Sequence, residues 1–277
     1  MKHLVMSEIY AHYPEVEILE CEDYTAKLPY GLPGGDWDLW GGVYKLTRED
    51  AYPIKTYVDF GLEKDPKEEF KVDPMVPFLE YMGQIGPDEQ LWLQYLLYPM
   101  KAAEWQEPVK KLRDTLSHRE DPTEDRVNFA KQSLTPGERD IVASIERRMG
   151  KLAFATGIRV LYMTKKGAFK PVNVIPLLGL YRNVNSEEGN QIAFTQSTTY
   201  DQSWEDPTGR RAEQLRAQFW REYRKRGWFF FPFRRKNMIF TTEELATLYH
   251  FPGSVASTPN LQRIGSKKAE APMNLPI

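Results

Sequence analysis

The sequence predicts an α+β fold in which helices cover a mainly antiparallel β-sheet. Strand-like alternation and helix-like periodicity follow one another in β-α-β order over residues 37–97. Two later segments carry the Thr-x-x-Glu spacing of a capping box, which marks the start of a helix. With 277 residues, of which 41% are hydrophobic and 13% aromatic, the chain can build one or two domains with a real core.

The first hundred residues contain the β-α-β pattern. Asp73 is the expected N-cap of its helix, with Pro74 in the first helical position, where a missing N–H is tolerated. The elements expected here are a helix over 1–13, a strand over Val16–Leu19, a loop over 23–35, strands over 37–47 and 54–60, a charged excursion over 59–71, a helix from Asp73 through Met82 closed by Gly86-Pro87, and a strand over Leu91–Leu97.

Residues 101–134 are charged and interrupted by prolines, so we expect an exposed helix followed by a connector. The capping box Thr135–Glu138, with proline in the first helical position, then begins a clear amphipathic helix. A strand over 157–163 and a helix over 169–181 follow it. The apolar stripe expected on the amphipathic helix consists of Ile141, Val142, Ile145, Met149 and Leu152.

The last third begins with a polar, irregular stretch over residues 183–209. An amphipathic helix over 210–226 comes next, and the second capping box, Thr241–Glu244, begins a short helix. Residues 254–277 contain prolines and no periodicity, which predicts an extended linker. The side chains expected to face inward from the amphipathic helix are Ala212, Leu215, Phe219 and Tyr223.

These elements group into three parts. Residues 1–182 form the expected α+β domain, with a charged insertion at 101–134. Residues 183–253 form a helical segment rich in basic and aromatic side chains, and residues 254–277 form the linker. Because the β-α-β rhythm has a spacing compatible with antiparallel pairing, we expect ferredoxin-like halves.

Charge is distributed unevenly along the chain. Residues 1–100 carry 19 acidic and 8 basic side chains, whereas residues 101–277 carry 20 and 29. The basic half is therefore suited to contact a polyanion or the acidic half. We find no apolar run long enough for a membrane span and no secretory signal, and the single cysteine, Cys21, fits a reducing cytosol.

The sequence contains no arrangement of residues typical of catalysis, of metal binding or of cofactor binding. The glycine clusters lack the Gly-Lys-Ser/Thr ending of a phosphate-binding loop. The four histidines have no metal-ligand spacing, and His250, late in a short helix, is expected to cap the last carbonyls. We therefore expect a protein that is not an enzyme and needs no cofactor.

Residues 210–236 are the one segment with a sharp chemical signature. Basic side chains alternate there with aromatic ones, among them Trp220 and Phe231. Cations neutralise phosphates and aromatic rings stack on bases, so the pattern indicates nucleic-acid binding. The alternative is an amphipathic helix whose basic face is merely solvated. The candidate nucleic-acid-binding residues are Arg210, Arg211, Arg216, Arg221, Arg224, Lys225, Arg234, Arg235 and Lys236, and Arg226 lies among them.

Stretches along the chain resemble the region preceding the motor of bacterial type IV secretion or conjugation ATPases, which belong with the HerA- and FtsK-type DNA pumps. The resemblance implies that a nucleotide-binding motor follows the tail and that a further region precedes the chain, so we expect a piece that lies before the motor. The stretches that carry it are Tyr10–Ile18, Trp37–Trp40, Asp50–Asp59, Asp65–Phe70, Gly86–Gln94, Thr242–Gly253 and Ser266–Pro276.

The function that the resemblance implies is a non-catalytic assembly or substrate-guiding module of a DNA-translocating ATPase. Its implied partners are the motor ATPase domain or subunit, further copies of the chain, DNA, and a membrane-associated secretion complex. The implied location is the cytoplasm, at the inner face of the membrane where such partners hold it. The alternative function is that of a stand-alone nucleic-acid-binding protein that uses residues 210–236.

Overall fold

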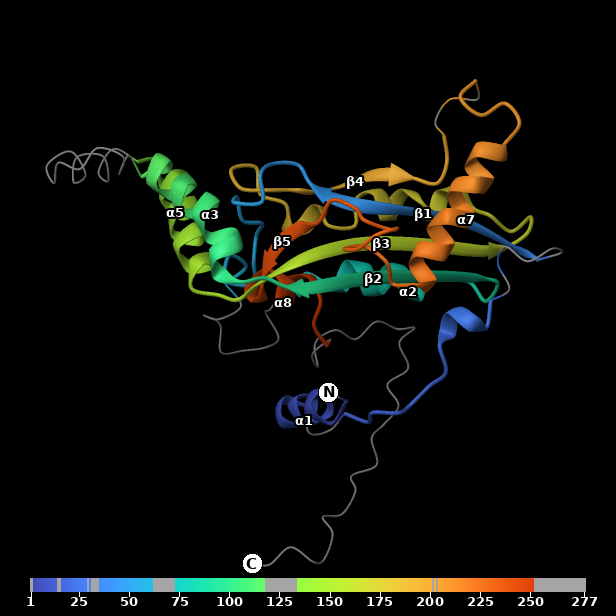
Figure 1. The fold of residues 1–277 in the computed structure, drawn as a ribbon, viewed down its shortest axis with the longest axis horizontal. Helices are drawn as coiled ribbons and strands as arrows, with labels where there is room; N and C mark the ends of the chain where they lie inside the picture. The colour runs from blue at the N-terminus through green and yellow to red at the C-terminus, as the bar shows by residue number, and fades with distance from the viewer. Residues whose placement is uncertain are drawn as a thin grey trace, which may run out of the picture.

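The fold is described from a computed structural model (Figure 1). It describes residues 2–13, 16–28, 30, 35–61, 73–117, 134–200, 202 and 204–251. The charged excursion expected up to residue 71 lies largely outside the described residues, and so do the connector after Leu116 and the tail over 254–277.

A five-stranded, open antiparallel sheet forms the centre of the fold, in the order β2-β3-β1-β4, with β5 paired to the start of β3. Because β1 and β2 both run antiparallel to β3, they are parallel to each other with β3 between them. In the same way β3 and β4 flank β1. The strands are β1 (Trp37–Leu46), β2 (Glu89–Pro99), β3 (Ala153–Lys165), β4 (Ile192–Ser197) and β5 (Met238–Thr241).

Two interleaved split β-α-β units result, β1-α2-β2 and β3-α6-β4, so the predicted ferredoxin-like, mainly antiparallel α+β fold is confirmed. Helices α2 (Val76–Gly83), α6 (Ile175–Leu178) and α8 (Thr242–Leu248) pack on one face of the sheet. Buried side chains from all five strands meet them there, including Tyr44, Tyr162 and Phe240.

Helix α7 (Arg210–Arg224) covers part of the opposite face of the sheet. The sequence analysis predicted no helix on this face. Phe219, Trp220 and Tyr223 of α7 pack on Leu161 and its neighbours in the sheet. The chain just after α7 packs so closely on β3 that the strand needs a glycine there. A Cβ added to Gly157 of β3 would lie 2.2 Å from the indole of Trp228.

Helices α3 (Ala102–Leu116) and α5 (Pro136–Met149) form a hairpin at the opposite end of the molecule from α7 (Figure 1). The hairpin has its own small core around Trp105, Val109 and Ile145, so α3 is not the exposed helix that its charged sequence predicts. Leu152, expected to extend the apolar stripe of α5, is 72% exposed because it follows the helix.

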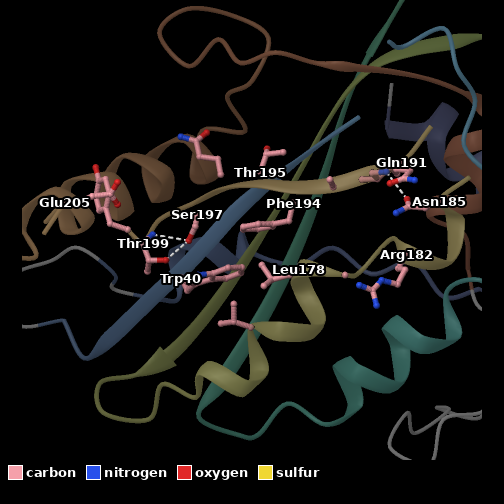
Figure 2. A pocket seen from close by; sticks show the side chains of 16 residues that line it. Trp40, Leu178, Arg182, Asn185, Gln191, Phe194, Thr195, Ser197, Thr199 and Glu205 are labelled. Carbon is pink, nitrogen blue, oxygen red and sulfur yellow. Dashed lines mark hydrogen bonds between the residues drawn. The ribbon is translucent and has the colours of Figure 1, made fainter. Parts of the chain in front are cut away.

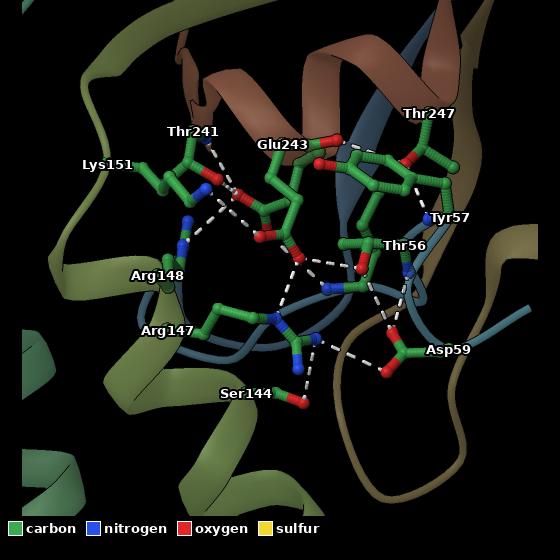
Figure 3. Close-up of polar contacts among 12 residues, drawn as sticks. Thr56, Tyr57, Asp59, Ser144, Arg147, Arg148, Lys151, Thr241, Glu243 and Thr247 are labelled. Carbon is green, nitrogen blue, oxygen red and sulfur yellow. Dashed lines mark hydrogen bonds and ion pairs between the residues drawn. The ribbon is translucent and has the colours of Figure 1, made fainter. Parts of the chain in front are cut away.

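Ion pairs link this hairpin to α8 (Figure 3). The Nε of Arg148 lies 3.1 Å from Oε2 of Glu244, and each of these two side chains is only 2% exposed. Arg147, on the outer side, contacts Glu243 at 3.0 Å and Asp59 at 3.3 Å. Two arginines of α5 therefore hold the α3–α5 hairpin to the carboxylates of α8 and of Asp59.

Residues 54–60 were predicted as a strand, and this prediction is wrong. Side chains of α8 form hydrogen bonds with polar groups of this segment, including a backbone N–H that a strand would donate to a neighbouring strand (Figure 3). The Tyr57 N–H donates to Oγ1 of Thr247 at 3.0 Å, and the Thr56 hydroxyl donates to Glu243 at 2.8 Å. The segment forms a turn instead.

Three other predicted elements differ from the structure. Val16–Leu19 is not a strand, since no strand of the described sheet pairs with it. The helix expected over 169–181 is a short 3-10 turn followed by α6. The stretch 183–209, expected to be irregular, contains β4, whose alternation is too weak to recognise in six residues. Residues 183–253 thus add β4 and β5 to the sheet.

Helix starts were predicted more successfully. The helix over 1–13 is confirmed as α1 (Lys2–His12), and both capping boxes begin helices, α5 and α8. The helix after Asp73 begins later than expected, at Val76, although the Asp73 carboxylate accepts the Met75 N–H at 2.7 Å. His250 caps α8 as predicted, since its ring Nδ1 lies 2.9 Å from the Ala246 carbonyl oxygen.

Replacing Thr135 with alanine should reduce the free energy of unfolding by about 0.5–2 kcal/mol. The Thr135 hydroxyl accepts the Glu138 N–H, and the Glu138 carboxylate accepts the Thr135 N–H at 2.8 Å, so alanine removes one half of the box. Chemical denaturation measures the change, with Thr135→Ser as the matched control. A serine variant as unstable as the alanine variant would contradict the capping role.

Candidate nucleic-acid interface

Helix α7 supplies most of the candidate residues, and local signals in the sequence account for its start. Gly209 has φ 71°, a left-handed conformation that glycine adopts without strain, and precedes the first helical residue. The Asp206 carboxylate accepts the Ala212 N–H at 2.8 Å, which satisfies a free amide of the first turn. Phe219 and Tyr223 are buried against the sheet and fix the inward face of the helix.

The outward face of α7 carries a line of cations. At about 100° per residue, Arg210, Arg221, Arg224 and Lys225 fall within one sector, opposite Phe219. All four side chains are exposed. They span about 22 Å along the helix axis at about 1.5 Å per residue. We call these four residues the α7 cation line.

The α7 cation line is not neutralised by nearby carboxylates. None of its four members forms an ion pair within the part of the chain that the structure describes. Arg224 instead lies over the Trp220 ring, 5.9 Å from its centroid, which keeps the guanidinium close to the helix surface. These charges are therefore available to an external anion.

A groove of about 450 Å³ lies beside the α7 cation line, between α7 and the 3-10 turn Tyr24–Ala26. Trp220 and Tyr30 form its apolar wall, with ring centroids 5.6 Å apart. Burial raises the pKa of Tyr30 to about 12, so its hydroxyl stays protonated at neutral pH. The groove thus combines aromatic walls with three cations at its rim, Arg221, Arg224 and Lys225.

The other predicted cations near α7 are engaged with the protein itself or partly buried. Arg235 is structural: its Nε lies 2.6 Å from the buried Glu222 carboxylate, and its guanidinium also contacts Gln196 of β4. Arg211 donates to the Glu205 carbonyl at 3.0 Å. Arg216 is half-buried, and its Nε has no hydrogen-bond partner among the described atoms.

The remaining cations lie outside the helix. Arg234 and Lys236 are exposed on the chain between α7 and β5, and Arg226, just past the helix end, pairs with Asp23 at 3.1 Å. The hydrogen bonds from Thr25, and then Arg226, hold the pKa of Asp23 below its usual range. The predicted patch is therefore not one surface, and the α7 cation line is the part of it that lies on one face of a helix.

The aromatic run Trp228–Phe233, which follows α7, is only partly buried. Trp228 is 2% exposed, whereas Phe230 and Phe231 are exposed by 66% and 93%. Phe230 contacts Tyr98 of β2 edge-on, with ring centroids 5.7 Å apart. The two phenylalanines thus add aromatic surface beyond the end of α7.

Sequence reasoning missed Arg159, a fully buried residue of β3 that holds the end of α7. Its guanidinium donates to the carbonyls of Glu222 and Gly227 and to the side chain of Gln94. Burial lowers its pKa to about 10, so it remains charged at neutral pH. In the sequence it looks like the outward residue of an alternating strand, because nothing local shows that α7 covers that face.

Within the described ranges, no group of three or more His, Cys, Asp or Glu side chains could hold a metal ion. Among the described helices, none has the length and apolar character needed to cross a bilayer.

The chain belongs to a family described as a domain of unknown function, DUF8128, whose model matches residues 2–263. No curated protein and no solved structure matches the chain. The match covers nearly the whole fold, including α7 and both capped helices.

Proposed function

We propose that the chain is a non-catalytic assembly or substrate-guiding module of a type IV secretion or conjugative DNA-translocating ATPase, and that the α7 cation line contacts the DNA. The observation that carries the proposal is the set of four exposed cations without an ion-pair partner among the described residues. The resemblance to the region preceding the motor of such ATPases supports the same role.

The geometry favours contact with the nucleic-acid backbone. Duplex DNA carries one phosphate charge per about 1.7 Å of axis, so a line of about 22 Å can contact several phosphates at once. Contacts of exposed cations with phosphates fix the position of a protein on DNA but carry no sequence information. Binding should therefore be independent of sequence, as a protein that guides DNA toward a motor requires.

The partners implied by this function are a motor ATPase domain or subunit, further copies of the chain, and a membrane-associated secretion complex. A stand-alone nucleic-acid-binding protein would use the same cation line. The two functions differ in what happens when a motor ATPase of the same secretion system is added. A guiding module should raise the DNA-stimulated ATP hydrolysis of that motor, whereas a stand-alone binder should leave it unchanged.

Reversing Arg221, Arg224 and Lys225 to glutamate should abolish DNA binding without unfolding the chain. The three side chains are exposed and lie off the apolar stripe, so their loss leaves the core intact. Fluorescence anisotropy with a labelled DNA duplex at low salt measures binding, and circular dichroism checks the fold. Wild-type chain that shows no binding at low salt would overturn the proposal.

A matched control variant distinguishes the effect of the α7 site on DNA binding from the effect of net charge. Reversing Lys101, Lys110 and Lys111 on the α3 side changes the charge equally, at the opposite end of the molecule (Figure 1). This variant should keep most of the affinity of the wild-type chain. Equal losses in the two triple variants would show that only overall charge matters and that α7 is no interface.

A further inference from the structure

A second groove, of about 870 Å³, runs along the outer side of β4 (Figure 2). Trp40 and Phe194 form part of its floor, stacked with ring centroids 5.2 Å apart. Leu178 of α6 adds apolar surface beside them, and the rim is polar. The groove lies on the face of the sheet that α6 covers, whereas α7 lies on the opposite face.

Strand β4 ends the strand order of the sheet, so the backbone on its outer side faces this groove. Ile192 turns its N–H away from β1, toward Oδ1 of Asn185 at 2.9 Å. Since the direction of backbone groups alternates along an antiparallel strand, Phe194 turns its N–H and C=O outward as well. No described residue pairs with Phe194 on that side. The edge therefore offers free hydrogen-bonding groups above an apolar floor.

Opposite charges mark the two ends of the groove (Figure 2). Arg182 lies near Asn185 and Gln191, at the start of β4, and Glu205 lies near Thr199, beyond its end. Neither side chain forms an ion pair within the described part of the chain. A ligand that complements the groove must carry an acid at the Arg182 end and a base at the Glu205 end.

We propose that this groove binds an extended peptide segment of a partner protein, which pairs antiparallel with β4 as an additional strand. Strand addition uses the main-chain groups of an exposed edge for affinity and the groove for side-chain specificity. Because an antiparallel partner runs against β4, its basic residue lies near its N-terminal end, beside Glu205, and its acidic residue lies near its C-terminal end, beside Arg182. Alternate apolar side chains face Trp40 and Phe194.

A nucleic acid fits this groove less well. One cation is balanced by one carboxylate across it, whereas a polyanion needs several cations along its backbone. The six residues of β4 span about 20 Å at about 3.3 Å each, which matches a peptide of similar length. The proposal is independent of the DNA-guiding function, since the two surfaces lie on opposite faces of the sheet.

The probe for the test is the end-blocked peptide Lys-Val-Thr-Val-Thr-Val-Asp, added to the full chain. Amide hydrogen exchange should show that the Phe194 N–H exchanges freely without peptide and is protected with it. Two peptides methylated on alternate backbone nitrogens provide the control. Methylation of the amides that face β4 should abolish binding, and methylation of the other set should leave it. Equal behaviour of the two peptides, or no protection at Phe194, would overturn the proposal.

Charge reversal tests the orientation. Arg182→Glu should weaken binding of the probe about fivefold, as expected for one exposed ion pair. A peptide with its lysine and aspartate exchanged should bind poorly to wild type and recover on the double variant Arg182→Glu, Glu205→Lys. Arg221→Glu, on the other face, should leave peptide binding unchanged. Displacement of the peptide from β4 by a DNA oligonucleotide would assign the groove to nucleic acid and contradict the proposal.

Discussion

Replacing Arg148 with alanine is expected to lower the free energy of unfolding by about 3–5 kcal/mol. The side chains of Arg148 and Glu244 are both 2% exposed, so the variant leaves the Glu244 carboxylate buried without its partner. The guanidinium also donates to the carbonyls of Asp50 and Ile239, which lose these bonds. Chemical denaturation followed by circular dichroism measures the loss.

Two comparisons show whether the buried charge is the cause. Arg147→Ala removes two ion pairs, to Glu243 and Asp59. Because Arg147 is 31% exposed and Lys151 still lies 4.0 Å from Glu243, the cost should be smaller, about 1 kcal/mol. The double variant Arg148→Met, Glu244→Gln removes both charges but keeps a side-chain acceptor in the capping box of α8, and it should be more stable than Arg148→Ala alone. If the double variant were the less stable one, the loss would come from packing rather than from an unpaired charge.

Arg159→Ala should destabilise the fold by a similar amount, about 3–5 kcal/mol, since it removes charged hydrogen bonds and leaves a cavity. Arg159 lies 5.2 Å from the Tyr223 ring centroid and 5.9 Å from that of Trp228, so its loss opens the contact between β3 and the end of α7. Hydrogen exchange of the Arg235 amide, which donates to the Trp228 carbonyl, should accelerate most.

Arg159→Lys is the matched variant. Lysine keeps the charge but cannot reach the carbonyls of Glu222 and Gly227 together, so its stability should fall between those of wild type and Arg159→Ala. A loss below about 1 kcal/mol in the alanine variant would show that Arg159 does not hold α7 in place.

The sequence was informative where the signal is local. A capping box lies within four residues, so Thr135 and Thr241 marked helix starts correctly. Strands β2 and β3 contain long runs rich in apolar side chains and were recognised over most of their length. The antiparallel α+β class followed from these elements.

Other features depend on contacts between distant residues and were missed for that reason. The segment around Tyr57 alternates like a strand, but α8, almost two hundred residues away, takes its amides. Arg224 and Arg235 look alike in the sequence, yet only Arg235 meets the buried carboxylate of Glu222. The sequence therefore placed Arg235 among the candidate cations, although the fold itself uses this side chain.

The salt dependence of DNA binding tests the proposed interface most directly. If the four members of the α7 cation line each neutralise one phosphate, log affinity should fall against log salt with a slope of about −3.6 on duplex DNA. The wild-type chain should then lose about 150-fold in affinity between about 50 and 200 mM salt. Any binding left after reversal of Arg221, Arg224 and Lys225 should have a slope near about −0.9. A slope that is the same in the wild-type and reversed chains would contradict contact through α7.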